Sequence, residues 1–459
     1  MALSTYAAPK GVSRRSFLRG TAAVATGAMM LPGGAFAGSQ DALLVWLPGG
    51  SDVFCKLHTE LLNGYATKNG RAESKLMCGL GQDTEYSQAM IAAIAAGSPP
   101  DVALTWDSPV SLGSQGAFEA LDAMMSKSKI NIDTWPAGLL SSCQFKGVTY
   151  GLPVTAGLYS MWYNREMFDA KGIPSDRASF PKTWVEMRKM SKEFTVWDGD
   201  TLTTAGFFPP RTAETYAIWS ALNGGTLFDE KNLKYTIDAE QNVEMFHFFL
   251  DWINEEYKGD LNLVDRTGNF RDGYPDATLG TGPMFQAGRL AGFESGSWLL
   301  GDLYGDFPPT FTNWDLADHP VGPSGTKTVS GTWPNWFVIP VGTKDPQAGF
   351  DYLTFMATEG VLTWFAAVPD IPTNSLVTLT SPASLVERRG EAFAAEAMAF
   401  FSEQAKIVTP MWNSPAQSFS NDQIKNAMGK IFSKASTVED ALADAQAASQ
   451  AELDRVLAG

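Results

Sequence analysis

Histidine is scarce in this chain of 459 residues, and its scarcity removes most catalytic and metal chemistry. The three histidines, His58, His247 and His319, stand far apart, and two of them fall in predicted helices, where core or surface roles are expected. No H-E-x-x-H pair, C-x-x-C pair, EF-hand loop or G-x-S-x-G nucleophile sequence is present. We therefore expect no metal ion, no cofactor and no catalytic residue, and hence a protein that is not an enzyme.

Cysteine is equally sparse, with only Cys55, Cys78 and Cys143. One bridge is possible in an oxidising compartment, with one thiol left over. A fold of this size needs no covalent staple, and scattered cysteines are commonly buried and free. We expect no disulfide.

Positive charge and long apolar runs are also limited. The chain has 34 Lys and Arg against 50 Asp and Glu, a net charge of −16. Such an acidic surface repels nucleic acid and anionic lipid, so no nucleic-acid partner is expected. No segment approaches the roughly 20 uninterrupted apolar residues that span a bilayer.

The N-terminal region carries an export signature. The stretch "SRRSFLRG" at 13–20 precedes the short, alanine-rich run "TAAVATGAMMLPGGAFA", which ends with Ala35 and Ala37 in A-x-A spacing. The order Ser-Arg-Arg-x-Phe-Leu resembles the twin-arginine export motif. We expect residues 1–37 to be a signal peptide and the mature, periplasmic chain to start near Gly38.

The pattern after this region predicts an α/β fold. A bulky apolar strand at 42–47 is followed by a helix at 52–67, a strand in "SKLMCGL", a helix in "EYSQAMIAAIAAG" and a strand in "DVALTW". This βαβαβ order favours a parallel sheet covered by helices. A second set follows, with a strand-to-helix passage in "MWYNREMFDAKG" and amphipathic helices in "TWVEMRKMSKEF" and "AEQNVEMFHFFLDWINEEY". Further helices are predicted in "FDYLTFMATEG" and near 391–405 and 438–457.

Tryptophan, in contrast, is abundant, with fourteen in the chain. Several follow predicted strands in Gly/Pro-flanked positions: Trp106, Trp298, Trp333, Trp336 and Trp412. A flat indole can cover the C–H face of a pyranose while polar neighbours bond its hydroxyls. Each could equally be a core aromatic, but open α/β sheets bind ligands beyond the strand ends.

Four ordered blocks resemble one family over nearly the whole mature length. They are "AAIAAGSPPDVALTWDSPVSLGSQGAFEALDAMM", "YGLPVTAGLYSMWYNREMFDAKGIP…PKTWVEM", "FQAGRLAGFESGSW" and "VEDALADAQAASQAELD". The chain resembles the bacterial extracellular solute-binding proteins (family 1) of carbohydrate ABC transporters and is distantly similar to maltose-binding protein. The resemblance implies a sugar-binding monomer that serves membrane permease subunits.

The same resemblance implies a two-lobed periplasmic-binding-protein fold of type II, each lobe a central sheet flanked by helices. We expect an N-terminal lobe of 38–155 plus 327–370 and a C-terminal lobe of 156–326 plus 371–459. Crossings near Leu152–Ala156, Gly322–Gly331 and Pro369–Asn374, all rich in proline or glycine, would act as the hinge. Closure on a mono- or oligosaccharide or a polyol would create the shape that a permease recognises.

Candidate ligand-binding residues follow from the matched blocks. Trp106 and Asp107 match positions at the first cleft wall of maltose-binding protein, and Trp298 matches the tryptophan of the Gly-x-Trp block in that protein. Gly157 stands near a position where maltose-binding protein has a carboxylate, so the hydrogen-bonding pattern of that protein does not transfer to this chain. Arg211 is as readily explained by a surface ion pair. The full candidate set is Ser51, Asp52, Trp106, Asp107, Thr155, Tyr159, Arg211, Tyr216, Trp298, Trp333 and Trp412.

Three other functions remain open. A periplasmic glycosidase or lyase would need a paired-carboxylate or histidine-centred site, which the sequence does not reveal. A binding protein for cations such as polyamines would fit the acidity, with an aromatic cage rich in carboxylates. A scaffold protein fits least, because nothing repeats. The sequence does not name the sugar, its length or its linkage.

The arginine pair generates the first prediction. Changing Arg14 and Arg15 together to lysine keeps the charge, but we expect export to stop, because a receptor reads guanidinium geometry. Arg19→Lys is the matched control and should be exported normally. Fractionation of cells that express each form is the measurement. Normal periplasmic levels of the double variant would leave an ordinary secretory signal instead.

Overall fold

The computed structural model describes residues 42–49, 52–81, 83–128, 131–210, 213–261, 263, 284–302, 312–377, 380–409 and 412–458. The predicted signal peptide therefore lies outside the described residues. From Ala42 onward the chain forms one compact unit. Within the described ranges, every helix is too short or too polar to cross a membrane.

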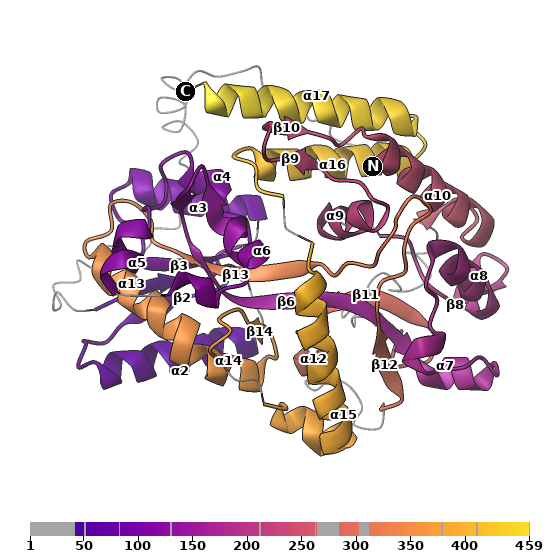
Figure 1. Ribbon diagram of the computed structural model, residues 1–459, viewed down its shortest axis with the longest axis horizontal. Coiled ribbons are helices and arrows are strands. Elements are labelled where there is room, and N and C mark those ends of the chain that lie inside the picture. Colours follow the sequence, from indigo (N-terminus) through magenta and orange to yellow (C-terminus); the bar gives the residue numbers. More distant parts are fainter. Residues whose placement is uncertain are drawn as a thin grey trace, which may run out of the picture. The chain divides into compact units, whose positions relative to one another are not determined.

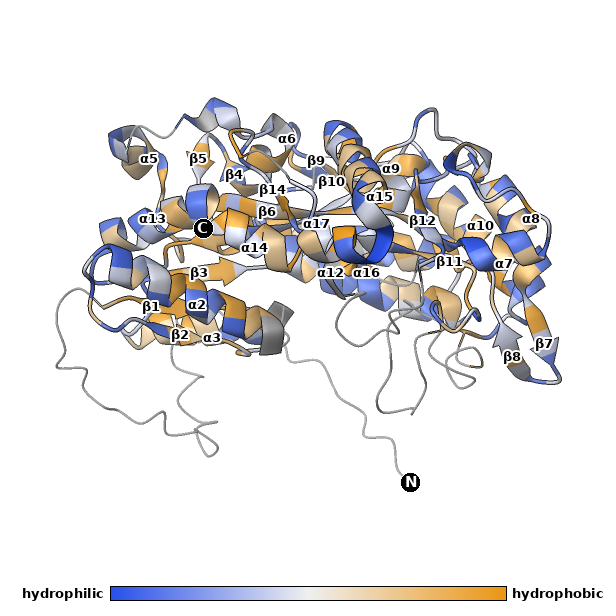
Figure 2. Cartoon of the chain, turned by 90° about the horizontal axis from the view of Figure 1, so that it is seen from below, coloured by the Kyte–Doolittle hydropathy of each residue, from blue (hydrophilic) through white to orange (hydrophobic). Residues whose placement is uncertain are grey.

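The first elements form the predicted βαβαβ unit. They are β1 (Leu44–Trp46), α2 (Asp52–Lys68), β2 (Lys75–Met77), α3 (Asp83–Ala95) and β3 (Val102–Thr105). Strand β1 pairs in parallel with both β2 and β3, as the sequence pattern predicts. Figure 2 shows these strands as largely apolar segments beside helices of mixed hydropathy.

One long strand, β6 (Leu152–Asn164), organises the whole sheet. Its first half pairs antiparallel with β13 (Thr332–Val338) and β14 (Ile371–Pro372), and its second half with β11 (Gly292–Gly296) and β12 (Trp314–Ala317). All thirteen residues of β6 are buried. The result is one eight-stranded sheet. Six strands follow the order β11-β6-β13-β3-β1-β2, and β12 and β14 pair with β6 outside this order. Figure 1 shows β6 and β13 running between two groups of helices.

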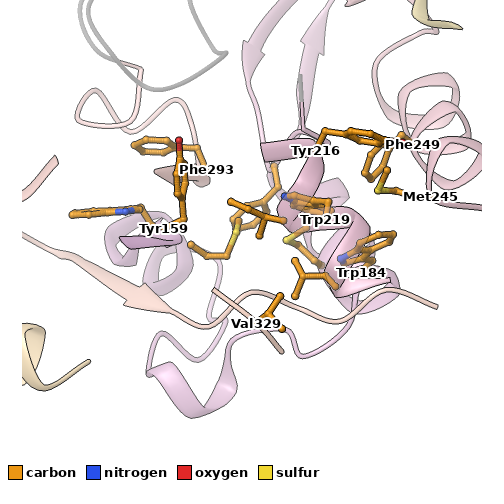
Figure 3. Close-up of a cluster of buried hydrophobic side chains, with 14 of the residues drawn as sticks. Tyr159, Trp184, Tyr216, Trp219, Met245, Phe249, Phe293 and Val329 are labelled. Carbon is orange, nitrogen blue, oxygen red and sulfur yellow. The ribbon is translucent and has the colours of Figure 1, made fainter. Parts of the chain in front are cut away.

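Two hydrophobic clusters pack along this strand. Along β6, Leu152 and Val154 belong to one cluster, the N-terminal core, whereas Ala156 and Leu158 belong to the other, the C-terminal core. Figure 3 shows part of the C-terminal core, where Trp184 lies 5.0 Å from Trp219 between ring centroids. The change of core thus falls at residues 154–156. The lobe boundaries themselves stay a prediction.

The three predicted crossing segments meet at this point. Ile371 in the third segment is the strand partner of Ala156 in the first. The backbone N–H of Tyr159 donates to the carbonyl of Gly331, which ends the second segment, at 3.0 Å. The three predicted crossing segments are therefore joined to one another through β6.

The remaining elements cover the two cores. Thr183 and Glu186 form a reciprocal capping box at the start of α8, which fixes where this predicted helix begins. The predicted helix near 391–405 is the second half of α15, which departs from helical geometry at Gly390, with φ 82°. The other elements, with η marking single turns of tighter or wider helix, are α4 (Pro109–Gly113), α5 (Asp122–Ser128), η2 (Ile132–Thr134), α6 (Ala137–Leu140), η3 (Ser141–Cys143), β4 (Gln144–Phe145), β5 (Val148–Thr149), α7 (Arg165–Ala170), η4 (Arg177–Ser179), α8 (Trp184–Phe194), β7 (Val196–Asp198), β8 (Thr201–Thr204), α9 (Ala213–Leu222), β9 (Phe228–Asp229), β10 (Lys234–Tyr235), α10 (Glu240–Glu256), α12 (Leu299–Asp302), α13 (Pro346–Phe355), η5 (Met356–Gly360), α14 (Val361–Ala367), α15 (Ala383–Gln404), η6 (Ala405–Ile407), α16 (Gln417–Phe432) and α17 (Val438–Leu457).

The last helix, α17, completes the edge of β10. The Gln446 side chain accepts from the backbone N–H of Ile237 at 2.7 Å and donates to the carbonyl of Tyr235 at 2.5 Å. One turn later, Gln450 accepts from the N–H of Tyr235 at 3.0 Å. Two side-chain amides thus bond backbone groups of the β10 segment, as a neighbouring strand would.

The expectation of no disulfide is wrong: Cys55 and Cys78 are bonded, with their Cα atoms 5.8 Å apart. The reason lies in the sheet. Parallel strands end at the same edge, so the first turn of α2, which follows β1, lies near the residue that follows β2. Cys143 is free and buried, and its burial raises the pKa of the thiol.

The disulfide generates the second prediction. Because it closes a loop with a sequence separation of 23, the change of Cys55 and Cys78 to serine should cost roughly 3 kcal/mol of unfolding free energy. Urea unfolding with and without a thiol reductant is the measurement. Reductant should weaken the wild-type protein but leave the double variant unchanged. Equal sensitivity of both proteins would contradict a stabilising bridge.

Candidate functional site

The candidate site is one face of the sheet around Gly157. Alternation along β6 sends Thr155, Gly157 and Tyr159 to the same face. Their partners on β13 are Asn335, opposite Thr155, and Trp333, opposite Gly157. Because directly paired residues share a face, side chains from both strands meet here.

Partly exposed tryptophans gather on this face. Of the fourteen tryptophans, four are not buried: Trp106, Trp197, Trp298 and Trp333. Trp333 is on β13, and the contacts below place Trp106 and Trp298 on the same face. Three of these four tryptophans thus share one face of the sheet, and ligand pockets are commonly lined by aromatic side chains, which makes this face the candidate site.

Two glycines seat Trp298 against the sheet. A Cβ atom on Gly157 would lie 2.2 Å from Cε3 and Cζ3 of Trp298, and one on Gly296 would lie 2.0 Å from Cζ3. Tyr159, the strand partner of Gly296, meets the same indole edge-on, with ring centroids 5.2 Å apart. The indole therefore sits directly on backbone, at a depth that any side chain at either glycine would prevent.

A hydrogen-bonded chain runs across the face beside Trp298. The indole Nε1 of Trp106 donates to Oδ1 of Asn335 at 2.9 Å. Nδ2 of Asn335 donates to Oγ1 of Thr155 at 2.8 Å and to Oδ2 of Asp370 at 3.4 Å. The loop after β3, the strand β13 and the residue before β14 are thus joined through one amide.

The environment of Trp106 is largely aromatic. Phe54 lies 6.4 Å from its ring, and His58 is packed between Phe54 and Trp364, 4.4 Å from each ring centroid. Burial lowers the pKa of His58 to about 3, so its imidazole is neutral near pH 7. Asp107, the next residue after Trp106, accepts from the Ser87 hydroxyl at 3.1 Å.

A second carboxylate lies further along the same face. Glu294 is the strand partner of Met161, which lies two residues beyond Tyr159 on β6. The side chain of Glu294 therefore points to the same face of the sheet as that of Tyr159. Its Oε1 lies 2.9 Å from Nε2 of His319, and its Oε2 accepts from Nε1 of Trp219 at 2.9 Å. Glu294 is therefore held from two sides at the border between the site face and the helix α9.

The structure brings together five predicted site residues: Trp106, Thr155, Tyr159, Trp298 and Trp333. Asp107 follows directly in the Trp106 loop. Ser51 and Arg211 lie outside the described residues, and Asp52 begins α2, with a side chain outside the description.

Two predicted site residues belong instead to the C-terminal core. Tyr216 is fully buried against Phe246, with ring centroids 5.2 Å apart, because α9 turns it inward. Burial raises the pKa of its hydroxyl. Trp412 is 9% exposed and packs edge-on against Tyr235 at 5.9 Å. Tyr216 is therefore corrected to a core residue, whereas the ligand-binding role of Trp412 stays a prediction.

Sequence reasoning missed Asn335, Asp370 and Glu294. Asn335 was within reach, because it stands two residues after Trp333 in the strand-like "TWPNWF" at 332–337, and period-2 alternation puts both on one face. Asp370 and Glu294 carry no local signal, since long-range pairing alone brings them here. Among the described residues, no three His, Cys, Asp or Glu side chains are placed to hold a metal ion.

Solved structures that resemble this protein share its fold, the two-lobed α/β fold of binding proteins. CpMnBP1 with mannotriose bound superposes with a TM-score of 0.74 at 20% identity, over 89% of this chain and 100% of that one. A substrate-binding protein of an ABC system from Listeria monocytogenes, in complex with cycloalternan, gives 0.70 at 16% identity, over 91% and 99%. MalE of Bdellovibrio bacteriovorus bound to maltotriose gives 0.68 at 14% identity, over 90% and 100%.

The family then follows from the sequence. This chain belongs to the bacterial extracellular solute-binding proteins, whose family model matches residues 78–394, well over half of the chain. An arabinooligosaccharide-binding protein of Halalkalibacterium halodurans is 28% identical over 109 residues. That match spans only 23% of this chain and 22% of the relative.

The seat of Trp298 generates the third prediction. Gly157→Ala forces the indole off the sheet and should cost about 1–3 kcal/mol of unfolding free energy. In a Trp298→Ala background the same change should cost under about 0.5 kcal/mol, because the clashing ring is gone. Urea unfolding of the four proteins measures the coupling. Gly64→Ala, where nothing lies within 4 Å of the added Cβ, is the control. Simple additivity would show that the ring does not rest on Gly157.

Proposed function

We propose that this protein captures a sugar, whether a mono- or oligosaccharide or a polyol, on the site face and delivers it to an ABC importer. The gathering of Trp106, Trp298 and Trp333 on one face, partly exposed and beside oriented polar groups, carries the proposal. Indoles cover the C–H faces of sugar rings, while amide and carboxylate groups bond their hydroxyls. No covalent step is needed, so the protein would not be an enzyme.

The relatives support a carbohydrate ligand. Those with known ligands hold mannotriose, cycloalternan and maltotriose, and the sequence relative is named for arabinooligosaccharides. These carbohydrates differ in sugar and in linkage, so the relatives favour the ligand class and leave the individual sugar open.

Hinge closure is the mechanism that we infer. The lobes would be 38–155 plus 327–370 and 156–326 plus 371–459, turning where β6 changes core. The segment before α16 touches the N-terminal side: Gln115 donates to the carbonyl of Pro415 at 3.4 Å, and the hydroxyls of Ser111 and Ser418 lie 3.2 Å apart. These weak polar contacts could break on opening at little cost and re-form when a sugar shifts the balance toward closure.

The cellular setting completes the proposal. Export through the twin-arginine pathway would place a monomer in the periplasm, where the closed form docks on permease subunits in the membrane. The motif at 13–20 supports this route, and membership of an extracellular family supports export in general.

The fourth prediction tests the function directly. A thermal-shift screen of neutral sugars, polyols and amines should raise the Tm with one or more sugars and with no polyamine. For a confirmed sugar, Trp298→Ala should cost on the order of 2–4 kcal/mol of binding free energy, while the free energy of unfolding falls much less.

Hinge closure predicts that small-angle scattering of the sugar-bound protein gives a smaller radius of gyration than that of the free protein.

Three outcomes would count against this proposal. Stabilisation by amines alone would favour a cation-binding protein, whose aromatic and carboxylate cage Asp370 and Glu294 could supply. Turnover of a tested glycan would favour an enzyme. A destabilised Trp298→Ala protein that still binds its sugar normally would remove this residue from the site.

A further inference from the structure

Asp370 lies beside the two glycines on which Trp298 rests. It is the residue before β14, and the pairing of Pro372 with Thr155 anchors this segment beside Gly157. Its carboxylate atom Oδ1 lies 3.6 Å from the position that a Cβ on Gly157 would occupy, the same position that lies 2.2 Å from two ring atoms of Trp298. A carboxylate oxygen thus borders the six-membered ring of the indole.

The orientation of the Asn335 amide beside Asp370 is fixed by a donor that cannot be reversed. The indole N–H of Trp106 can only donate, so the Asn335 atom that it contacts must be the amide oxygen. The amide nitrogen of Asn335 then necessarily faces Thr155 and Oδ2 of Asp370. Oδ2 therefore accepts from Asn335, and Oδ1 lies on the side of Gly157, whose added Cβ it would meet at 3.6 Å.

This arrangement matches the two faces of a sugar. A pyranose whose C–H face covers an indole carries its hydroxyls around the rim of the ring, in reach of groups at the indole's edge. An ionised carboxylate accepts hydrogen bonds without donating any, and a hydroxyl donor gives it a short, charge-assisted bond. When the Asp370 carboxyl is ionised, its negative charge also repels a carboxylate or phosphate on the ligand, and at 6% exposure the solvent screens this repulsion only weakly.

We propose that Asp370 is a ligand-contacting, specificity-determining residue: it accepts hydroxyl hydrogen bonds from a sugar stacked on Trp298 and excludes acidic sugars from that position. Asn335 is its positioning residue. The inference rests on the proposed function and narrows the ligand class to neutral sugars, because exclusion of the wrong partner by like charge is a direct source of specificity.

The fifth prediction uses matched pairs of sugars that differ only in the oxidation of C6. The pairs are mannotriose and trimannuronate, glucose and glucuronate, and galactose and galacturonate, with affinity measured by calorimetry on the full mature chain. We expect the wild-type protein to bind a neutral member and to bind its acidic counterpart at least 100-fold more weakly. In Asp370→Asn, affinity for the neutral sugar should fall about 10-fold, and the preference over the acidic sugar should shrink by at least 10-fold.

Controls separate a role in binding from a role in folding. Asp200→Asn removes an equal charge from a side chain that is 87% exposed, and should leave both affinities unchanged. Asp370→Ser serves if Asp370→Asn unfolds, with the same expected loss of discrimination. In Asn335→Ala the carboxylate keeps its charge but loses its anchor, so neutral affinity should fall while the acidic sugar stays excluded.

The outcomes distinguish this inference from the function on which it rests. If the wild-type protein binds neutral sugars and Asp370→Asn keeps both the affinity and the preference, Asp370 does not contact the ligand, and the proposed function stands. If the wild-type protein prefers the acidic member of a pair, the inference is overturned. If no neutral sugar binds at all, the proposed function and the role of Asp370 fail together.

Discussion

The pairing of β6 with β13 is the constraint on which the rest of this structure depends. It joins the two cores, because Val154 packs into one and Ala156 into the other on the same strand. It also sets the site, because the register places Trp333 opposite Gly157. A shift of β13 by one residue would turn its side chains to the other face of the sheet and take Trp333 and Asn335 away from Gly157 and Thr155.

The site shows how a sheet assembles chemistry from distant parts of a chain. The hydrogen-bonded chain on this face draws on Trp106, Thr155, Asn335 and Asp370, four residues from four different segments. Each is close to a strand that is fixed by backbone pairing, so its position depends little on its own flexibility. The two glycines under Trp298 are brought together by a different pairing, that of β6 with β11.

Local patterns predicted much of the fold but little of the polar site. Helix α17 at Val438–Leu457 coincides with the predicted 438–457, and the βαβαβ order is correct, because both follow from periodicity. The Cys55–Cys78 bond and the place of Asp370 depend on which strand edges meet, which no local window encodes. The prediction that Tyr216 contacts the ligand was wrong for a related reason. It assumed that Tyr216 lies in a loop, whereas Tyr216 lies in α9 and its side chain is buried in the C-terminal core.

The side-chain amides of α17 have a consequence for the order in which the protein is made. Gln446 and Gln450 bond the backbone of the β10 segment, roughly two hundred residues earlier in the chain. A ribosome releases residues from the N-terminus onward, so β10 waits for these partners until roughly two hundred further residues have been made. Because Leu442 and Leu453 of α17 also belong to the C-terminal core, this core reaches its final form only after α17 has emerged.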